Sequence, residues 1–394
     1  MRILISAGEA SGDMYGAQLI EAMRACWGKA DRSPTSTLEF FGAGGERMHA
    51  AGCDIVVDAK DLAVVGITEV VSHLPKILDL YKKLIAAADQ QRPDAAVVID
   101  SPAFNWRVAR QMRRRGIPVV YYVCPQFWAW RQGRAKLLRD YVTKALVIFP
   151  FEEKFYRDRG VDATFVGHPL ADLPIPEIPR MEFAAQYGLN ADRMWIALLP
   201  GSRRKEFRFN LPPIIEAVKQ LGKEFQFVLP VASTLDFQWA HDQVFHSHSR
   251  SKAISPFVAL TREALPSLRH ARAAVVASGT ATVEAALMET PFVMVYRVSP
   301  LTYALGKPRI KVPHFAMVNL IAGEEVVPEL VQRKFTAENI VAELRKIIPD
   351  GPARDAMVRG LKSVREKLSG PGGANGATGY ASERAAKIIL DMLK

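Results

Sequence analysis

The stretch ISAGEASGD, residues 5–13, decides the fold of this chain together with LPGSR, residues 199–203, and SGTATVE, residues 278–284. Each stretch follows a continuous apolar run and precedes a helical pattern. A glycine turn at that junction directs free backbone N–H groups at whatever lies above the strand, and phosphate is the usual guest. Because such turns occur in both halves, the sequence predicts two Rossmann-like, doubly wound α/β domains that face each other across a cleft.

The rest of the chain alternates β and α patterns. Apolar runs that are continuous rather than alternating indicate parallel strands covered on both faces. We expect strands at residues 3–6, 40–42, 95–100, 119–123, 146–149, 195–199, 225–230, 273–277 and 292–296. We expect helices at residues 13–26, 76–88 and 104–115, and a last helix at 381–393.

A proline-rich stretch, LPIPEIP at residues 173–179, is typical of a linker between domains. It predicts an N-terminal domain over residues 1–172 and a C-terminal domain over residues 173–352. We expect residues 353–394, which include the last helix, to return to the N-terminal domain and complete it.

The composition limits the function classes. The three cysteines, Cys26, Cys53 and Cys124, are scattered, which favours a reducing compartment over a zinc or redox site. The first apolar run is too short for a signal peptide, and no run approaches the length of a membrane span. The net charge of +11 favours an anionic partner. Nucleic acid is not favoured, because the basic residues are interspersed with acids and no nucleic-acid motif occurs.

Three charged residues follow apolar strands or glycine turns, and each has a functional and a structural interpretation. Asp100 lies at a strand end, where open α/β sheets place ligand groups; it either accepts a proton or caps the next helix. Arg203 either grips a diphosphate bidentately or is a surface arginine in a basic run. Glu284 either binds ribose hydroxyls or stabilises the helix dipole.

An ordered set of motifs resembles the lipid-A-disaccharide synthases, and the resemblance covers nearly the whole chain. The motifs are GEASGD at 8–13, IDSP at 99–102, PQFWAWR at 125–131, PFE at 150–152, GHPLAD at 167–172, LPGSR at 199–203, SGTA at 278–281, YR at 296–297 and NLIAG at 319–323. The resemblance implies an inverting GT-B glycosyltransferase. Such an enzyme joins UDP-2,3-diacylglucosamine to 2,3-diacylglucosamine 1-phosphate (lipid X), and releases UDP and the β-1,6 disaccharide of lipid A.

The resemblance also implies roles for particular residues, with Asp100 as the general base. The implied donor site comprises Gly201, Ser202, Arg203, Gly279, Thr280, Ala281, Glu284, Arg297 and Asn319. The implied acceptor or cleft residues are Glu9, Ser11, Gly12 and Asn105. The family usually carries a second acid where this chain has Ala103. No Asp-x-Asp or clustered ligand spacing is evident, so we expect no metal and no cofactor.

Acylated substrates require an apolar surface. Residues 62–80 are apolar and edged by lysines, which indicates either a membrane-facing surface or an ordinary amphipathic helix packed on the sheet. The resemblance favours peripheral attachment to the anionic cytoplasmic face of the inner membrane, and it alone suggests a homodimer. The expected membrane-facing residues are Val70, Val71, Leu74, Ile77, Leu78 and Phe209. A soluble UDP-sugar 2-epimerase and a non-enzymatic nucleotide-binding scaffold are the alternatives.

Overall fold

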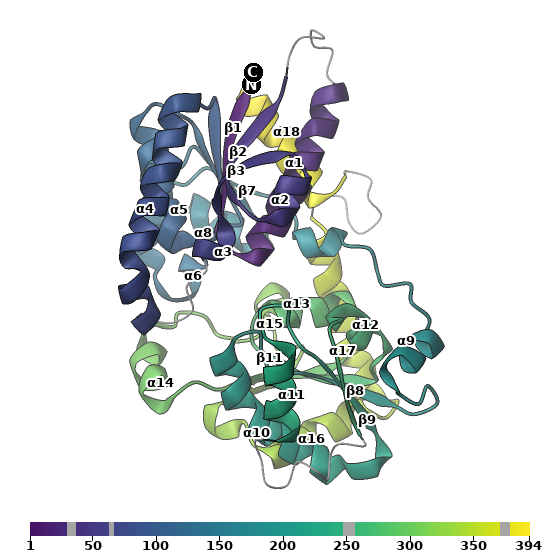
Figure 1. Cartoon of the computed structure of the whole chain (residues 1–394). Helices are drawn as coiled ribbons and strands as arrows, with labels where there is room; N and C mark the ends of the chain where they lie inside the picture. Colours follow the sequence, from purple (N-terminus) through teal and green to yellow (C-terminus); the bar gives the residue numbers. More distant parts are fainter. Residues whose placement is uncertain (30–36, 63–66, 247–256, 371–378) are drawn as a thin grey trace. The chain divides into compact units, whose positions relative to one another are not determined.

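The structure is a computed structural model that describes residues 1–29, 37–62, 67–246, 257–370 and 379–394 (Figure 1). The chain forms two compact units. Unit 1 comprises Met1–Asp172 and Leu368–Lys394, and unit 2 comprises Leu173–Lys367. The chain returns to unit 1 at Leu368 and not at residue 353, the boundary expected from the sequence. The reason is that helix α17 (Pro352–Leu368) continues unbroken to Leu368.

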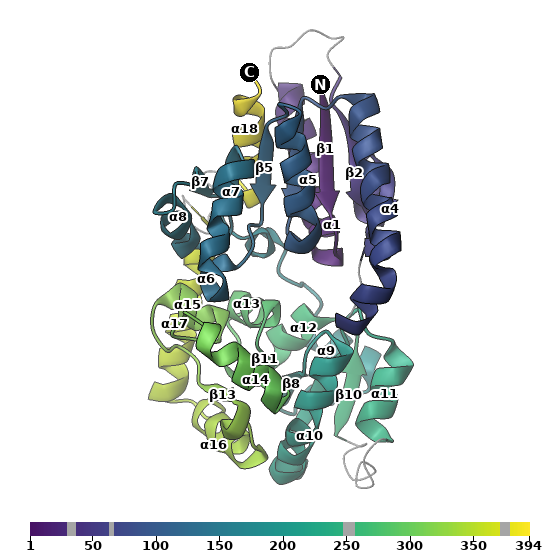
Figure 2. The ribbon, with the colours of Figure 1, turned by 90° about the vertical axis from the view of Figure 1, so that its left-hand side faces the viewer.

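Unit 1 is built on a seven-stranded parallel sheet with the strand order β3-β2-β1-β4-β5-β6-β7. Helices α4 and α5 cover one face of this sheet, and α1 and α18 lie on the other (Figures 1 and 2). The strands are β1 (Arg2–Ala7), β2 (Glu39–Gly44), β3 (Cys53–Asp58), β4 (Ala95–Ile99), β5 (Val119–Tyr122), β6 (Lys144–Val147) and β7 (Ala163–Phe165). The helices are α1 (Ala10–Lys29), α2 (Glu46–Ala50), α3 (Ala59–Leu62), α4 (Ile67–Gln91), α5 (Pro102–Arg114), α6 (Phe127–Trp130), α7 (Ala135–Tyr141), α8 (Pro150–Arg157) and α18 (Ala381–Met392).

Unit 2 is built on a six-stranded parallel sheet with the strand order β10-β9-β8-β11-β12-β13. Helix α10 packs against α16, and α13 packs against α12 and α15. The strands are β8 (Trp195–Leu199), β9 (Gln226–Pro230), β10 (Val258–Thr261), β11 (Ala273–Ala277), β12 (Phe292–Tyr296) and β13 (Glu329–Val331). The helices are α9 (Arg180–Tyr187), α10 (Arg204–Leu221), α11 (Phe237–Phe245), α12 (Ala264–His270), α13 (Thr280–Leu287), α14 (Pro300–Gly306), α15 (Met317–Ala322), α16 (Ala337–Ile347) and α17; short 3₁₀ turns include η5 (Lys307–Arg309) and η6 (Gln332–Lys334).

The inner strands explain the continuous apolar runs of the sequence. Every residue of β4, β5, β8 and β11 is buried, as expected of parallel strands covered by helices on both faces. All of the strands expected from the sequence are present. The strands that were not expected, β3, β7, β10 and β13, are the edges of the two sheets, and each combines buried residues with partly buried or exposed ones.

The last helix returns to unit 1, as the sequence predicted. One apolar side of α18 is buried against α1. Two polar contacts fix its start: the Ala381 N–H donates to Asp172 at 2.5 Å, and the Arg384 guanidinium donates to the carbonyls of Val166 and Ser369. Gly167 has a φ of +88°, and a Cβ there would lie 2.4 Å from the Arg384 Nη2 atom, so the docked helix requires glycine at that corner.

Candidate active site

The carboxyl ends of β4 and β5 carry strained backbone. Asp100 and Ser101 follow β4 with φ values of +47° and +44°, and Val123 follows β5 with a φ of +58°. Left-handed conformations cost non-glycine residues of order 1–3 kcal/mol each, and a β-branched valine is among the least suited to them. Ser101 occupies the N-cap position of α5, directly after Asp100, and its side chain accepts no capping hydrogen bond.

Asn105 holds this strained corner in place. Its Oδ1 accepts a hydrogen bond from the Ser6 hydroxyl at 2.7 Å, and its Nδ2 donates to the carbonyls of Ile99 (2.8 Å), Asp100 (2.9 Å) and Ser6 (3.1 Å). The Tyr121 hydroxyl donates a further bond to the Asp100 carbonyl at 2.7 Å. Asn105 is fully buried, and its amide groups are committed to protein atoms. The prediction that Asn105 lines a cleft is therefore wrong. Its side chain is buried and holds the backbone at the ends of β1 and β4 in position.

The first glycine turn divides into exposed and buried residues. Glu9 and Ser11 are exposed, whereas Gly12 is buried, and a Cβ on Gly12 would lie 3.2 Å from the Cβ of Ala7. Gly12 therefore allows α1 to approach β1 and is not an open cleft residue. Gly8 is equally constrained, since a Cβ there would lie 2.5 Å from the Ser101 hydroxyl.

Asp13 lies in α1, but its side chain caps the start of α2. Its carboxylate accepts hydrogen bonds from the backbone N–H groups of Gly45 (2.6 Å), Arg47 (3.1 Å) and Met48 (3.1 Å), which begin α2. A carboxylate at this position satisfies the free N–H groups of the helix start and complements its dipole. Asp13 is thus structural.

Two buried ionisable groups lie near the carboxyl end of β6. Burial raises the pKa of Glu152 to about 7, although its carboxylate accepts hydrogen bonds from the Trp128 indole (2.8 Å) and from the backbone N–H groups of Ile148 and Phe149 (both 3.1 Å). Burial lowers the pKa of His168 to about 3, so this imidazole is neutral. Its Nδ1 accepts the Leu170 N–H at 3.1 Å, which gives His168 a structural role.

In unit 2, the turn after β8 presents Arg203. Gly201 has a φ of +127°, and a Cβ there would lie 2.8 Å from the Glu206 Cβ. Glu206 pairs with the Arg203 Nη1 at 3.2 Å and therefore orders the loop. Ser202 is exposed, and its carbonyl accepts the Thr234 hydroxyl at 2.6 Å. Arg203 keeps 64% of its side chain exposed, so its guanidinium is available to an anion.

The second glycine turn lies at the start of α13. Gly279 has a φ of +141° and caps the helix; Gly279 and Thr280 are exposed, and Ala281 is half-buried. Glu284 is the fifth residue of α13, beyond the first turn to which dipole stabilisation is confined. Burial raises its pKa, and no residue in the described part of the chain donates a hydrogen bond to its carboxylate. An unsatisfied, half-buried acid beside a phosphate turn is suited to ligand hydroxyls.

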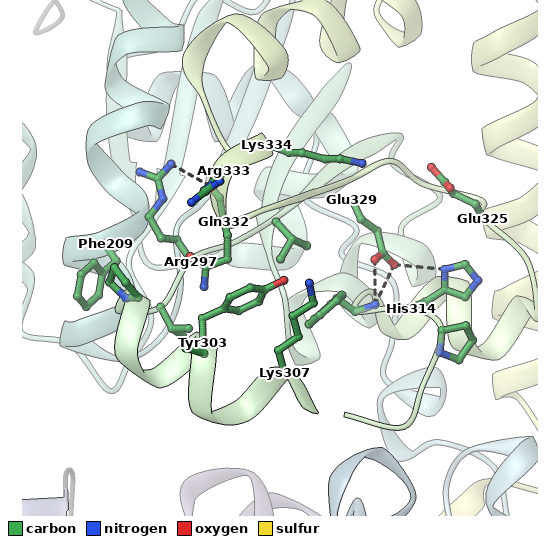
Figure 3. Close-up of a pocket in the computed structure, with 16 residues that line it drawn as sticks. Phe209, Arg297, Tyr303, Lys307, His314, Glu325, Glu329, Gln332, Arg333 and Lys334 are labelled. Atoms are coloured by element: carbon green, nitrogen blue, oxygen red, sulfur yellow. Dashed lines mark hydrogen bonds and ion pairs between the residues drawn. The ribbon is translucent and has the colours of Figure 1, made fainter. Parts of the chain in front are cut away.

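Asn319 and Arg297 lie further along the same edge of the sheet. Asn319 is fully buried: its Oδ1 accepts from the N–H groups of Val326 and Val327, and its Nδ2 donates to the Val327 carbonyl and the Glu329 carboxylate, all at 2.9–3.0 Å. The expectation that Asn319 binds the donor directly is wrong for this reason. The Arg297 Nη2 donates to the carbonyls of Gln332 and Phe335, and Arg297 lines a pocket of about 1060 Å³ shown in Figure 3.

The predicted membrane-facing residues fall into three groups. The side chains of Val70, Val71 and Leu74 lie outside the described residues. Ile77 is half-buried against the core of unit 1, which fits the interpretation of a packed amphipathic helix, whereas Leu78 is 46% exposed. Phe209 is half-buried and lines the pocket of unit 2. Within the described residues, no helix combines the length and apolar character that crossing a membrane requires.

One group of potential metal ligands was not recognised in the sequence. His241, Asp242 and His246, on and just after α11, place their ligand atoms within 4.8 Å of one another on the surface of unit 2. Neither the phosphate turns nor the pocket includes any of them.

Comparisons with known proteins agree with this architecture. The family model described as lipid-A-disaccharide synthetase matches residues 3–369. The chain is 53% identical over 393 residues to the lipid-A-disaccharide synthase of Koribacter versatilis, covering all of this chain and 98% of that protein. It is 48% identical to the synthase of Acidobacterium capsulatum, covering 100% and 96% of the two chains.

Two solved structures confirm the fold class. The glycosyltransferase of kitacinnamycin superposes with a TM-score of 0.63 at 16% identity, covering 100% of this chain and 99% of that one. The UDP-GlcNAc 2-epimerase of Neisseria meningitidis, bound to UDP-GlcNAc, superposes with a TM-score of 0.59 at 14% identity, covering 100% and 99%. At these identities the likeness shows the GT-B arrangement of two Rossmann-like domains and nothing of the activity. The sequence matches establish more: the chain belongs to the lipid-A-disaccharide synthase family and is a glycosyltransferase.

Proposed function

We propose that this enzyme transfers 2,3-diacylglucosamine from UDP-2,3-diacylglucosamine to the 6-hydroxyl of 2,3-diacylglucosamine 1-phosphate, with inversion. The products are the β-1,6 disaccharide 1-phosphate and UDP. The observation that carries the proposal is the carboxylate of Asp100, held at the end of β4 by a strained backbone that Asn105 and Tyr121 fix in position. Strain of this kind persists where the surrounding structure overdetermines it, and it is common at catalytic positions.

Unit 2 supplies the groups that a nucleotide donor needs. We propose that the Arg203 guanidinium and the N–H groups at the start of α13 neutralise the diphosphate, and that Glu284 accepts hydrogen bonds from the ribose hydroxyls. Arginine keeps its charge throughout, and helix N-termini bind phosphate through their free N–H groups. Both therefore stabilise the negative charge that develops on the departing UDP.

Unit 1 supplies the base. In the proposed step the acceptor 6-oxygen forms a bond to the anomeric carbon, while the bond from that carbon to the diphosphate oxygen breaks and leaves its electron pair on UDP. The proton of the 6-hydroxyl passes to the Asp100 carboxylate. We further propose that the enzyme works at the cytoplasmic face of the inner membrane. The exposed Leu78 on α4 and the net charge of +11 support that site of action.

The decisive experiment measures UDP release from UDP-2,3-diacylglucosamine, with and without the acceptor, in detergent micelles that contain a chelator. We expect release that depends on the acceptor, together with a disaccharide product. Replacing Asp100 with alanine should lower turnover by about 10²–10⁴ while UDP affinity stays unchanged. Equal losses in turnover and UDP affinity would remove Asp100 from the role of base, and release without acceptor would contradict the transferase reaction.

Arg203 has a matched control in the next residue. Arg203→Ala should weaken UDP binding and turnover together, because the guanidinium contacts the diphosphate before and during reaction. Arg204→Ala removes the same charge from an exposed side chain whose guanidinium lies 5.3 Å from the Trp239 ring. Isothermal titration with UDP should separate the two variants, and equal affinities would exclude Arg203 from the phosphate site.

A further inference from the structure

A basic pocket lies in unit 2, next to the glycine turn of the proposed donor site. The pocket of about 1060 Å³ opens at the carboxyl ends of β12 and β13, between α14 and η5 on one side and η6 on the other (Figure 3). Its wall is partly apolar, and five of the apolar or aromatic residues are Val298, Pro300, Tyr303, Phe315 and Val331. Its basic residues are Arg297, Lys307, Arg333 and Lys334.

The positive charge of this pocket is not neutralised from within the protein. Two carboxylates, Glu325 and Glu329, also line the pocket, so the four basic side chains exceed the acids by two charges. In the part of the chain that the structure describes, no carboxylate forms an ion pair with Lys307, Arg333 or Lys334. Like charges gathered without partners destabilise a fold unless an anion binds among them.

Glu329 is already committed elsewhere. Its carboxylate accepts hydrogen bonds from the backbone N–H groups of Phe315 and Ala316 at 2.9–3.0 Å and from the Asn319 amide at 2.9 Å, and it lies 3.7 Å from the His314 Nδ1. These contacts fix the Glu329 carboxylate in the wall of the pocket. The role of the buried Asn319 follows from this, because it holds Glu329 against the loop that forms the pocket wall.

The pocket adjoins the second phosphate turn but is distinct from it. The Ser278 hydroxyl, next to Gly279, donates to the Phe315 carbonyl at 2.9 Å, and the Phe315 ring lies nearly parallel to that of Tyr296 at 6.1 Å. Phe315 is therefore a wall shared by the turn and the pocket.

We propose that this pocket binds the phosphate monoester of an acylated acceptor, with the apolar wall against its hydrocarbon. The inference rests on the proposed function, in which the acceptor carries one such phosphate. A phosphate monoester has a charge of about −1.5 to −2 at pH 7, which matches the excess of two positive charges. Figure 3 shows the Lys307 ammonium and the Tyr303 hydroxyl side by side and directed into the pocket, as two donors to phosphate oxygens.

Arg297 adds hydrogen-bond donors to those of Lys307 and Tyr303. Its Nη2 is bonded to the carbonyls of Gln332 and Phe335, which fixes the guanidinium, while no described residue accepts a hydrogen bond from its Nε or Nη1. A guanidinium held in this way loses little entropy on binding, and its Nε and Nη1 remain as single donors. Lys307 and Lys334 reach the pocket from different turns, η5 and η6, so a phosphate between them is held from two sides.

The test is calorimetric titration with a short-chain, soluble diacylglucosamine 1-phosphate, beside the same compound without its phosphate. Lys307→Ala and Lys334→Ala should each weaken binding of the phosphorylated compound by about 10-fold, the effect of one lost charged hydrogen bond. Binding of the phosphate-free compound and of UDP should not change. Lys307→Arg should retain most of the affinity. Lys223→Ala, which removes an exposed charge from the turn η3 (Gly222–Glu224), is the matched control and should resemble the wild type.

Each other outcome has a definite meaning. Unchanged affinity for the phosphorylated compound in both lysine variants would overturn the inference, as would a parallel loss of UDP binding. A membrane phospholipid is the other source of a lipid-borne phosphate, and co-sedimentation with phosphatidylglycerol and phosphatidylcholine vesicles tests it. Lysine variants that lose only binding to the anionic vesicles would overturn the acceptor assignment. Lysine-dependent binding in an enzyme that releases no UDP would support the pocket and refute the proposed transfer.

Discussion

Replacing Asn105 with alanine tests whether the backbone of the proposed base, Asp100, depends on one buried amide. The substitution removes four hydrogen bonds of 2.7–3.1 Å and leaves the Ser6 hydroxyl without its acceptor in a fully buried place. The Asp100 carbonyl keeps its bond from the Tyr121 hydroxyl. A buried polar group left unsatisfied costs about 1–3 kcal/mol, so we expect Asn105→Ala to lower the free energy of unfolding by about 3 kcal/mol.

The functional consequence separates positioning from folding. Because Asn105 holds the backbone of Asp100, the variant should lose turnover while its affinity for UDP, which binds unit 2 in our proposal, stays at the wild-type value. Urea denaturation measures the free energy of unfolding, UDP release measures turnover, and titration with UDP measures the affinity for UDP. A loss of less than about 0.5 kcal/mol, the range of ordinary surface substitutions, would refute the reasoning.

Ser6 provides the control for this prediction. Ser6→Ala removes a single bond of 2.7 Å, and we expect it to cost about 1 kcal/mol. The two side chains are direct partners, so the double variant should be more stable than the sum of the two losses predicts, with a coupling energy of about 1 kcal/mol. Additive losses would show that the Ser6 hydroxyl and the Asn105 amide act independently.

Two further predictions follow from buried or strained positions. The pKa of Glu152 rises from 4.5 to about 7 on folding, so its contribution to stability is fully present below pH 4.5 and is lost as the pH rises through about 7. Between those limits the wild type should lose about 3 kcal/mol relative to Glu152→Gln in urea denaturation at each pH, and parallel curves would contradict the assignment. Gly201→Ala should weaken UDP binding, because its φ of +127° and the Glu206 Cβ at 2.8 Å leave no room for a methyl group. Gly28→Ala, with no heavy atom within 4 Å of the added Cβ, should bind UDP normally, and equal affinities in the two variants would count against the strain argument.

The strands that could be predicted from the sequence are those buried on both faces. Runs such as β4 and β8 are apolar throughout, because helices cover each side. The edge strands give no such signal. In β3 the exposed Asp54 and Asp58 interrupt the run, and β13 is three residues long and begins with Glu329, whose carboxylate is bound by backbone N–H groups. Such short or interrupted segments have the composition of loops.

The positions of the glycine turns could also be predicted from the sequence, but the structural roles of Asn105 and Asn319 could not. The resemblance to the family suggested that Asn105 and Asn319 contact ligands. Each is fully buried and bonded to backbone groups of a neighbouring strand end or loop. A signal was present, since both stand within apolar stretches of a helix, where an amide must find partners inside the protein. Which backbone groups it finds depends on how the helix packs, and the sequence does not specify that.

Left-handed residues provide an independent indication of where function lies in each unit. Arg92 and Glu289 have positive φ, but each follows a helix, where a left-handed residue ends the helix and satisfies its last carbonyls. Asp100, Ser101 and Val123 instead follow strands, at the carboxyl edge of the sheet. A left-handed residue there does not satisfy the last carbonyls of a helix. In unit 2, Gly201, Gly279 and Gln332 likewise follow β8, β11 and β13. The positive φ values of Asp100, Ser101, Val123 and Gln332 therefore mark the edge at which open α/β sheets bind their ligands, which supports the proposed positions of the base and of the phosphate sites.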